Sequence, residues 1–202
     1  MPRRRTLLTM LAGAVWLATV ITGMKLLWGY ARKPGVAASA PAEWPAASRI
    51  ARADRPVLVM LAHPHCPCTR ASLAELARLM TRLEGRVDAY VLFLKPAGLG
   101  GGWEQSDLWA RAAAIPGVTV LKDAGGEEAA RFGAATSGQT VLYDAAGRLR
   151  FAGGITIARG HQGDSLGQAL IAAVVDGKSS QLASTAVYGC SLRDPPAGGS
   201  ER

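Results

Sequence analysis

Short aliphatic runs alternate with segments of helical periodicity from residue 55 onward, and no other feature of the chain restricts its possible folds as much. Residues 55–63, with the sequence RPVLVMLAH, form a β-branched and aliphatic run that is typical of a buried strand. In residues 69–84 apolar side chains recur at intervals of three and four, which predicts an amphipathic helix ending at Gly85.

The alternation continues along the chain. It predicts further strands at 86–94, 117–123, 139–144 and 148–154, and further helices at 105–114, 126–133 and 164–177. Strands separated by helices are expected to pair in parallel, whereas the last two strands are joined by a tight turn and are expected to be antiparallel. The sequence therefore predicts an α/β fold with a central mixed sheet flanked by helices.

A stretch without charge precedes this region. The 19 residues from Thr6 to Met24 carry no charged side chain and would span about 28 Å as a helix, which is close to the hydrocarbon thickness of a bilayer. We interpret the stretch as one uncleaved transmembrane helix. A cleaved signal peptide is the alternative, because small residues lie near Ala40, but the apolar run is longer than a usual signal core and Pro41 follows the candidate cleavage site.

The charged residues suggest an orientation and exclude one class of partner. Three arginines and the amino terminus precede the apolar run and three basic residues follow it, a slight bias that favours the N-terminus inside and the domain in a periplasm-like or exterior space. Residues 1–34 hold six of the 23 basic residues and no acidic one, which leaves 17 basic against 15 acidic residues elsewhere. A nearly neutral domain without a nucleic-acid motif or a phosphate-binding loop predicts no nucleic-acid or nucleotide partner.

These observations divide the chain. The predicted segments are a cytoplasmic basic N-terminus at 1–5, a transmembrane anchor at 6–30, an Ala/Pro-rich linker at 31–54, a folded domain at 55–177 and a C-terminal tail at 178–202.

Two of the three cysteines lie where the first strand gives way to the first helix, in the sequence HPHCPC. A thiolate at a helix N-terminus is stabilised by free amide groups, so its pKa should fall below about 8.5. We interpret Cys66 and Cys68 as a redox pair that forms a reversible disulfide, or as an attacking thiol that another thiol resolves; an inert buried pair is the alternative. A disulfide between residues only two apart would be strained and easily reduced.

The histidines and the third cysteine leave further interpretations open. His63 and His65, with the two thiols, make a possible soft-metal site for Cu(I) or zinc, and His161 could complete it. Four ligands within HPHCPC do not converge easily, because alternate residues point apart. Cys190 is either a resolving thiol, an intermolecular link, a metal ligand or an incidental thiol.

Two segments carry a family resemblance. VLVMLAHPHCPCTRASLAEL, at 57–76, and VTVLKDAGGEEAARFGAATSGQTVLYDAAGRLRFAGG, at 118–154, resemble the thioredoxin superfamily, and most of all its membrane-tethered redoxins of the TlpA-like and RedB-like type. The resemblance implies a thioredoxin-like domain at 55–177 that reacts with protein thiols and disulfides.

The sequence also departs from this family. If Cys68 is set at the family's second cysteine, His65 occupies the position of the first, and the pair becomes Cys-Pro-Cys. The proline that the family places in cis before its fourth strand falls near Gly138 here. Cys190 has no counterpart in the ordinary family pattern.

The leading hypothesis is a membrane-anchored extracytoplasmic thiol–disulfide oxidoreductase without a cofactor. In it Cys66 attacks, Cys68 resolves, His65 tunes the thiolate and Cys190 is a third partner. The alternative is a copper-binding metallochaperone that uses Cys66, Cys68 and one histidine from the set His63, His65 and His161. A docking module without turnover is a third interpretation.

Overall fold

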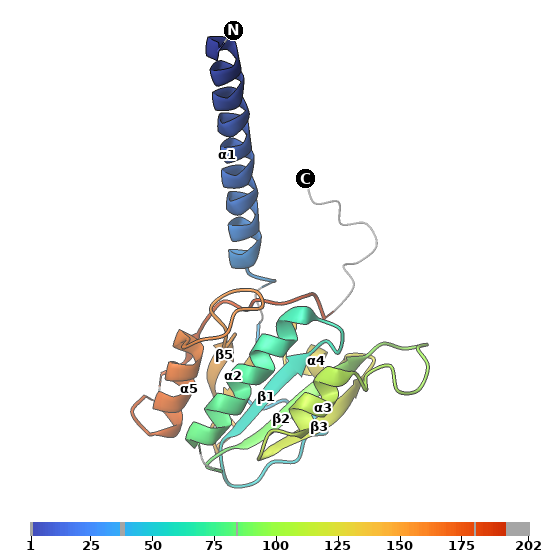
Figure 1. Cartoon of the computed structure of the whole chain (residues 1–202). Helices are drawn as coiled ribbons and strands as arrows, with labels where there is room; N and C mark the ends of the chain where they lie inside the picture. Colours follow the sequence, from blue (N-terminus) through green and yellow to red (C-terminus); the bar gives the residue numbers. More distant parts are fainter. Residues whose placement is uncertain (1, 37–38, 84, 180, 193–202) are drawn as a thin grey trace. The chain divides into compact units, whose positions relative to one another are not determined.

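The computed structural model describes residues 2–36, 39–83, 85–179 and 181–192 (Figure 1). It divides into an N-terminal unit, Met1–Lys33, and a second unit, Pro34–Arg202, which are described separately.

The N-terminal unit is one helix, α1 (Pro2–Arg32). The part Arg3–Arg32 reaches a mean hydropathy of 1.9 over its most apolar 18 residues, none of which is buried. The hydroxyls of Thr9, Thr19 and Thr22 donate to carbonyls four residues earlier, so these three polar side chains are satisfied within the helix. By length and composition α1 can cross a membrane, a criterion that an N-terminal signal sequence also meets.

The second unit is built on a six-stranded sheet with the order β3-β2-β1-β4-β5-β6. The strands are β1 (Val57–Ala62), β2 (Asp88–Lys95), β3 (Val118–Ala124), β4 (Gln139–Tyr143), β5 (Leu149–Gly153) and β6 (Ala183–Ser184). β1, β2 and β3 are parallel, β4 is antiparallel to both β1 and β5, and β6 runs parallel to β5. The predicted mixed α/β sheet is therefore confirmed, and the short β6 adds a strand that the sequence pattern did not reveal.

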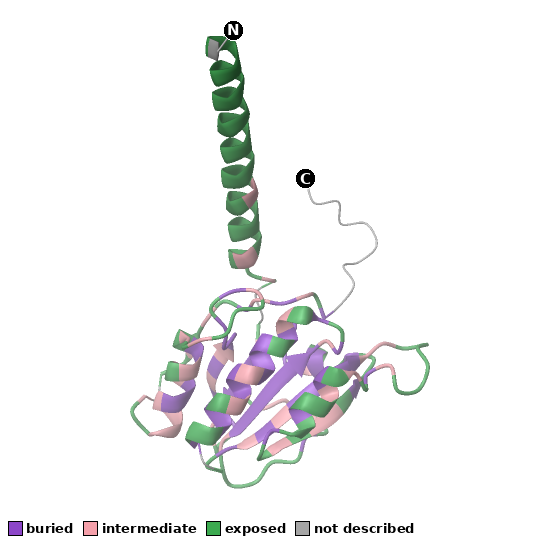
Figure 2. Cartoon of the chain, in the orientation of Figure 1, coloured by how far each residue is buried: buried purple, intermediate pink, exposed green. Residues whose placement is uncertain are grey.

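Helices cover both faces of this sheet. They are α2 (Pro67–Leu83), α3 (Asp107–Ala113), α4 (Glu127–Arg131) and α5 (Leu166–Val175). Alternate residues of β1 point to opposite faces: Leu58, Met60 and Ala62 join the apolar cluster under α2, α3 and α5, while Val57, Val59 and Leu61 join the cluster on the side of α4. Figure 2 shows β1 buried along its length beneath α2, as expected for a strand apolar on both faces.

Part of the Ala/Pro-rich stretch predicted as a linker packs against the domain. The indole of Trp44 meets the rings of Phe132 and Tyr143 edge-on, with centroids 5.1 and 5.2 Å apart. The Tyr143 hydroxyl donates to the carbonyl of Pro41 at 2.9 Å, and the Trp44 amide donates to the carbonyl of Gly147 at 2.7 Å. The aromatic and backbone contacts fix this stretch on the face that carries α4.

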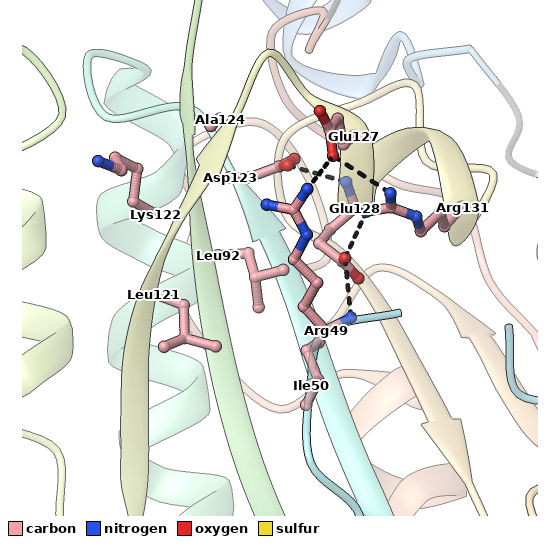
Figure 3. A pocket seen from close by; sticks show the side chains of 10 residues that line it. All are labelled: Arg49, Ile50, Leu92, Leu121, Lys122, Asp123, Ala124, Glu127, Glu128 and Arg131. Carbon is pink, nitrogen blue, oxygen red and sulfur yellow. Dashed lines mark hydrogen bonds and ion pairs between the residues drawn. The ribbon is translucent and has the colours of Figure 1, made fainter. Parts of the chain in front are cut away.

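A cavity of about 200 Å³ lies between this stretch, β3 and α4, and Figure 3 shows it from close by. The Glu128 carboxylate accepts hydrogen bonds from the Ser48 hydroxyl at 2.7 Å, the Arg49 amide at 3.1 Å and the Arg131 guanidinium at 2.6 Å. Asp123 accepts from the amides of Glu128 and Ala129 and so caps the N-terminus of α4. The carboxylates of Asp123 and Glu128 are thus occupied by contacts within the fold, and we interpret the cavity as a structural feature.

Glu75 is buried within α2, although the sequence pattern places it off the apolar stripe. Its carboxylate accepts hydrogen bonds from the Arg78 guanidinium at 2.7 Å, the Gly163 amide at 2.8 Å and the Gln168 side chain at 2.7 Å. A buried carboxylate is tolerated where its oxygens are satisfied in this way. Glu75 therefore connects α2 to the loop that precedes α5.

Replacing Glu75 with alanine is expected to lower the free energy of unfolding by about 2–3 kcal/mol, because three donors lose their acceptor. Denaturant titration of the full-length protein in detergent micelles measures the loss. The exposed Glu43 is the matched control, and Glu43→Ala should change stability by less than about 0.5 kcal/mol. Equal losses in the two variants would contradict this role of Glu75.

Candidate functional site

The Cys-Pro-Cys motif lies at the carboxyl end of the central strand, as the sequence predicts. β1 ends at Ala62 and α2 begins at Pro67, so Cys66 directly precedes the first helical residue. The Cys66 amide donates to the carbonyl of His63 at 3.2 Å, and the Thr69 amide donates to the carbonyl of Cys66 at 3.0 Å. Pro67 lacks an N–H at a position where the helix has no acceptor for one. The turn thus places the Cys66 sulfur at the helix N-terminus.

The sulfur of Cys66 is enclosed and receives hydrogen bonds. The residue is 2% exposed, and the backbone amide of Cys190 donates to its sulfur at 3.4 Å. Burial raises the pKa of the Cys66 thiol, but hydrogen bonds from the side chain and amide of Cys190 and from Thr69 more than offset it, so the pKa lies below the ordinary value for cysteine. The structure therefore favours a thiolate at Cys66.

The pKa values of the other two thiols, Cys68 and Cys190, are raised. Burial raises the pKa of Cys68, and the negative charge of Cys66 raises it further, with Arg159 acting against both. Burial and the same neighbouring thiolate raise the pKa of Cys190 to about 12. All three cysteines are free thiols in this structure. Of the three thiols, that of Cys66 alone has a lowered pKa, a property that favours the nucleophilic thiolate form.

Cys190 reaches the site through backbone pairing, despite lying 124 residues from Cys66. The Ser137 amide donates to the carbonyl of Cys190, and the Leu192 amide donates to the carbonyl of Ala135, both at 2.8 Å. An antiparallel bridge joins Thr136 and Ser191 between them. The C-terminal segment therefore lies along residues 135–137, the stretch just before β4.

Ser137 connects this stretch to the cysteine turn, and sequence reasoning missed it. Its buried hydroxyl oxygen accepts from the His63 amide at 2.8 Å and lies 2.8 Å from the Thr69 hydroxyl. The next residue, Gly138, donates its amide to the carbonyl of Leu61 at 2.8 Å and adopts φ of +88°. Gly138 thus occupies the position before β4 where the family resemblance places a cis-proline, and the described residues contain no cis peptide bond.

The two histidines of the motif contact Trp103, a residue of the loop between β2 and α3 that the sequence analysis did not single out. The His65 ring donates from Nε2 to the Trp103 carbonyl at 3.0 Å, and the His65 amide donates to Nδ1 of His63 at 3.1 Å. The two imidazoles meet the indole edge-on at centroid distances of 4.6 and 5.5 Å. The tuning of the Cys66 thiolate by His65 stays a prediction.

The metal hypothesis has no further support from the geometry. His161 lies in an exposed loop, where its Nδ1 is 2.8 Å from the carbonyl oxygen of Arg159. Within the part of the chain that the structure describes, no three side chains of His, Cys, Asp or Glu are grouped so as to hold a metal ion. The copper site of the alternative hypothesis stays a sequence-based prediction.

An open cavity of about 770 Å³ adjoins the C-terminal segment. Its lining combines His63 and Trp103 from the site with Leu94, Leu99, Ser191 and Leu192. The surface of the cavity is largely apolar, and its lining residue Ser191 directly follows Cys190. Pockets with a mainly apolar lining and a few polar groups are typical of ligand-binding sites.

The pKa of Cys66 makes a prediction about pH. The Cys66 thiolate should form at lower pH in the folded protein than in the unfolded chain. It therefore contributes to the stability of the fold at pH values above the pKa of the unfolded thiol, and this contribution is lost as the pH falls through the pKa of the folded protein. NMR of the full-length protein with isotopically labelled cysteine should give a lower midpoint for Cys66 than for Cys68 or Cys190. A midpoint for Cys66 above those of the other two would contradict the assignment.

The strand order and the placement of the cysteines define a thioredoxin-like fold, with the helix after the first parallel strand carrying the motif. No protein-family model matches the chain, and no curated protein matches it significantly.

The chain is similar to several solved structures. An uncharacterized conserved protein from Geobacillus kaustophilus is 18% identical, with a TM-score of 0.57, covering 83% of this chain and 95% of its own. A hypothetical protein from Sinorhizobium meliloti is 21% identical, with a TM-score of 0.56, covering 82% of this chain and 96% of its own. A secreted disulfide oxidoreductase from Mycobacterium tuberculosis is 18% identical over 61% of this chain and 82% of its own, with a TM-score of 0.42. The TM-scores of the Geobacillus kaustophilus and Sinorhizobium meliloti proteins, at identities of 18% and 21%, indicate a shared fold. They do not indicate a shared function, which depends on the site.

Proposed function

We propose that this protein is a membrane-anchored thiol–disulfide oxidoreductase that works through its Cys-Pro-Cys motif, with Cys66 as the attacking sulfur. The observation that carries the proposal is the environment of Cys66: an enclosed sulfur at the N-terminus of α2, hydrogen-bonded by the Cys190 amide and with a lowered pKa. A helix N-terminus and hydrogen bonds to the sulfur favour the thiolate, which is the nucleophilic form of cysteine.

The reaction begins when the Cys66 thiolate attacks one sulfur of a substrate disulfide. A mixed disulfide forms, the substrate's S–S bond breaks, and the other substrate sulfur leaves as a thiolate. A second thiol of the protein then attacks the Cys66 sulfur and releases the substrate in its reduced form. An external dithiol returns the protein to its reduced state and is itself oxidised; the same steps in reverse oxidise a substrate dithiol.

The membrane location is part of this proposal. α1 is long and apolar enough to serve as an anchor, and the bias of basic residues before it favours an N-terminus inside and a domain outside the cytoplasm. Structural and catalytic disulfides persist in such oxidising spaces, where protein disulfides are the available partners.

The full-length protein in detergent micelles is the material for the test. With a dithiol reductant and insulin as the disulfide substrate, the protein should accelerate insulin reduction over the reductant alone. In parallel, the reduced protein is titrated with Cu(I). Stoichiometric uptake of Cu(I) without any acceleration of insulin reduction would overturn the proposal in favour of metal handling.

A further inference from the structure

We propose that Cys190, and not Cys68, is the thiol that resolves the mixed disulfide at Cys66, so that the oxidised protein carries a Cys66–Cys190 disulfide. This inference rests on the proposed function and assigns the second sulfur of the same site. The sequence hypothesis gave that role to Cys68.

Backbone pairing holds Cys190 against Cys66. The carbonyl of Cys190 accepts from the Ser137 amide, and the amide of Cys190 donates to the Cys66 sulfur at 3.4 Å. The neighbouring Gly189 is fixed as well, because its carbonyl accepts from the Arg159 guanidinium at 2.7 Å. Main-chain anchors on both sides thus bring a cysteine from a distant part of the chain to the attacking sulfur.

Gly189 is the residue that permits this close approach. A Cβ at position 189 would collide with the backbone carbonyl of Ser137, an atom that a side-chain rearrangement cannot move. The segment can therefore lie along residues 135–137 only with glycine at this position, which ties the placement of Cys190 to its neighbour.

Cys68 is less well placed to close a disulfide. It is the second residue of α2, two positions after Cys66, and its thiol also lies near the Cys66 sulfur. A bond between them would close a small ring through Pro67 and force its torsion away from the preferred range. Because Cys66 and Cys190 are 124 residues apart, a bond between them has no such restriction from the chain.

The electrostatics give an order to the two steps. Besides burial, the hydrogen bond and thiolate of Cys66 raise the pKa of Cys190, and the charge of Cys68 adds to this, while Arg159 acts in the opposite direction. Once Cys66 is in a mixed disulfide its charge is lost, and Arg159 remains to favour the Cys190 thiolate. Cys68 gains from the same change, so the position of the sulfurs decides between them.

The resolving step is balanced as follows. Cys190 loses its proton to solvent and attacks the Cys66 sulfur, the bond between Cys66 and the substrate breaks, and the substrate sulfur leaves as a thiolate that takes up a proton. Two electrons have then passed from Cys66 and Cys190 to the substrate disulfide. The external dithiol named above restores both thiols.

Peptide mapping distinguishes the two disulfides directly. Trypsin places Cys66 and Cys68 together in the peptide Ala53–Arg70, since it does not cut before Pro56, and places Cys190 in Ser179–Arg193. The full-length protein is equilibrated with a glutathione buffer, quenched with acid, alkylated and digested without reduction. We expect the two peptides to be joined. A peptide Ala53–Arg70 that is two hydrogens lighter, with Cys190 alkylated, would overturn the proposal.

Serine variants give the matched comparison. Cys68→Ser should still yield the joined peptides, whereas Cys190→Ser should accumulate glutathione on Cys66. If Cys190→Ser instead reduces insulin like the wild type and closes a Cys66–Cys68 bond, this inference fails while the proposed function stands. If the wild type reduces no insulin at all, the proposed function itself fails.

Gly189→Ala tests the placement without removing a thiol. The collision with Ser137 should lower the equilibrium constant for forming the joined peptides by about tenfold or more at a fixed glutathione ratio. Gly101→Ala is the control, because a Cβ there meets no atom within 4 Å. An unchanged equilibrium in Gly189→Ala would contradict the positioning of Cys190 by residues 135–137.

Discussion

Cys66→Ser is expected to lower the rate of insulin reduction by about a thousandfold or more, to the rate of the dithiol alone. A hydroxyl forms no disulfide, and no other thiol of the site has a lowered pKa. The fold should survive this change, because serine is itself a favoured residue before a helix and can accept the Thr69 amide as the sulfur does. Initial rates and thermal unfolding of the same samples separate chemistry from stability.

Cys68→Ser is the matched variant for this experiment. It removes a thiol from the same motif but leaves Cys66 and its hydrogen bonds from Cys190 and Thr69 in place. Its reduced form should therefore still react with oxidised glutathione at Cys66 and go on to form the Cys66–Cys190 disulfide. A Cys66→Ser variant that reduces insulin at the wild-type rate would show that the attacking sulfur lies elsewhere.

Gly138→Pro is expected to destabilise the protein by about 3 kcal/mol or more, although proline is the residue that the family resemblance places there. Gly138 adopts φ of +88°, far from the value near −65° that a proline ring requires. The substitution also removes the amide that donates to the carbonyl of Leu61 at 2.8 Å. Denaturant titration of the full-length protein measures the loss.

Gly138→Ala separates the two causes. Alanine keeps the amide but must adopt the same positive φ, with its Cβ 2.9 Å from the Ser72 hydroxyl oxygen, so we expect a smaller loss of about 1–2 kcal/mol. A proline variant at least as stable as the wild type would show that the turn before β4 can adopt the family's usual geometry.

The sheet and its helices were predictable because their periodicities are local. The run at 57–62 is apolar on both faces of a central strand, and the apolar stripe of α2 follows helical spacing. The apolar stripe gave the wrong prediction for Glu75. This charged residue lies off the stripe but is buried, because a loop near Gly163 supplies hydrogen-bond donors to its carboxylate. Sequence patterns identify a charged side chain but not a distant group that will satisfy it.

The candidate site was predictable only in its local half. Cys66 and Cys68 could be placed at a helix N-terminus from a strand, a proline and an amphipathic stripe. The contact with Cys190 depends on backbone pairing between residues 135–137 and 190–192. Such pairing cannot be predicted from the periodicity of hydrophobic residues. The roles of Gly189, Ser137 and Trp103 could not be predicted either, because they depend on contacts between segments that are distant in the sequence.

The packing of Trp44, in the segment before the domain, was also not predicted from the sequence pattern. Its surroundings are rich in Ala and Pro and lack periodicity, which is typical of a linker. A tryptophan and Ile50 in such a stretch were the available signs that it packs on the domain, and the structure places both against the apolar cluster on the side of α4.

The central claim is that Cys66 belongs to a reversible redox centre, and a thiol count across a series of glutathione ratios tests it most directly. After acid quench, denaturation and alkylation, the mass of the full-length protein reports how many of its three cysteines are free. We predict one reversible two-electron step from three free thiols to one, without bound glutathione. Three free thiols at every ratio would contradict the account.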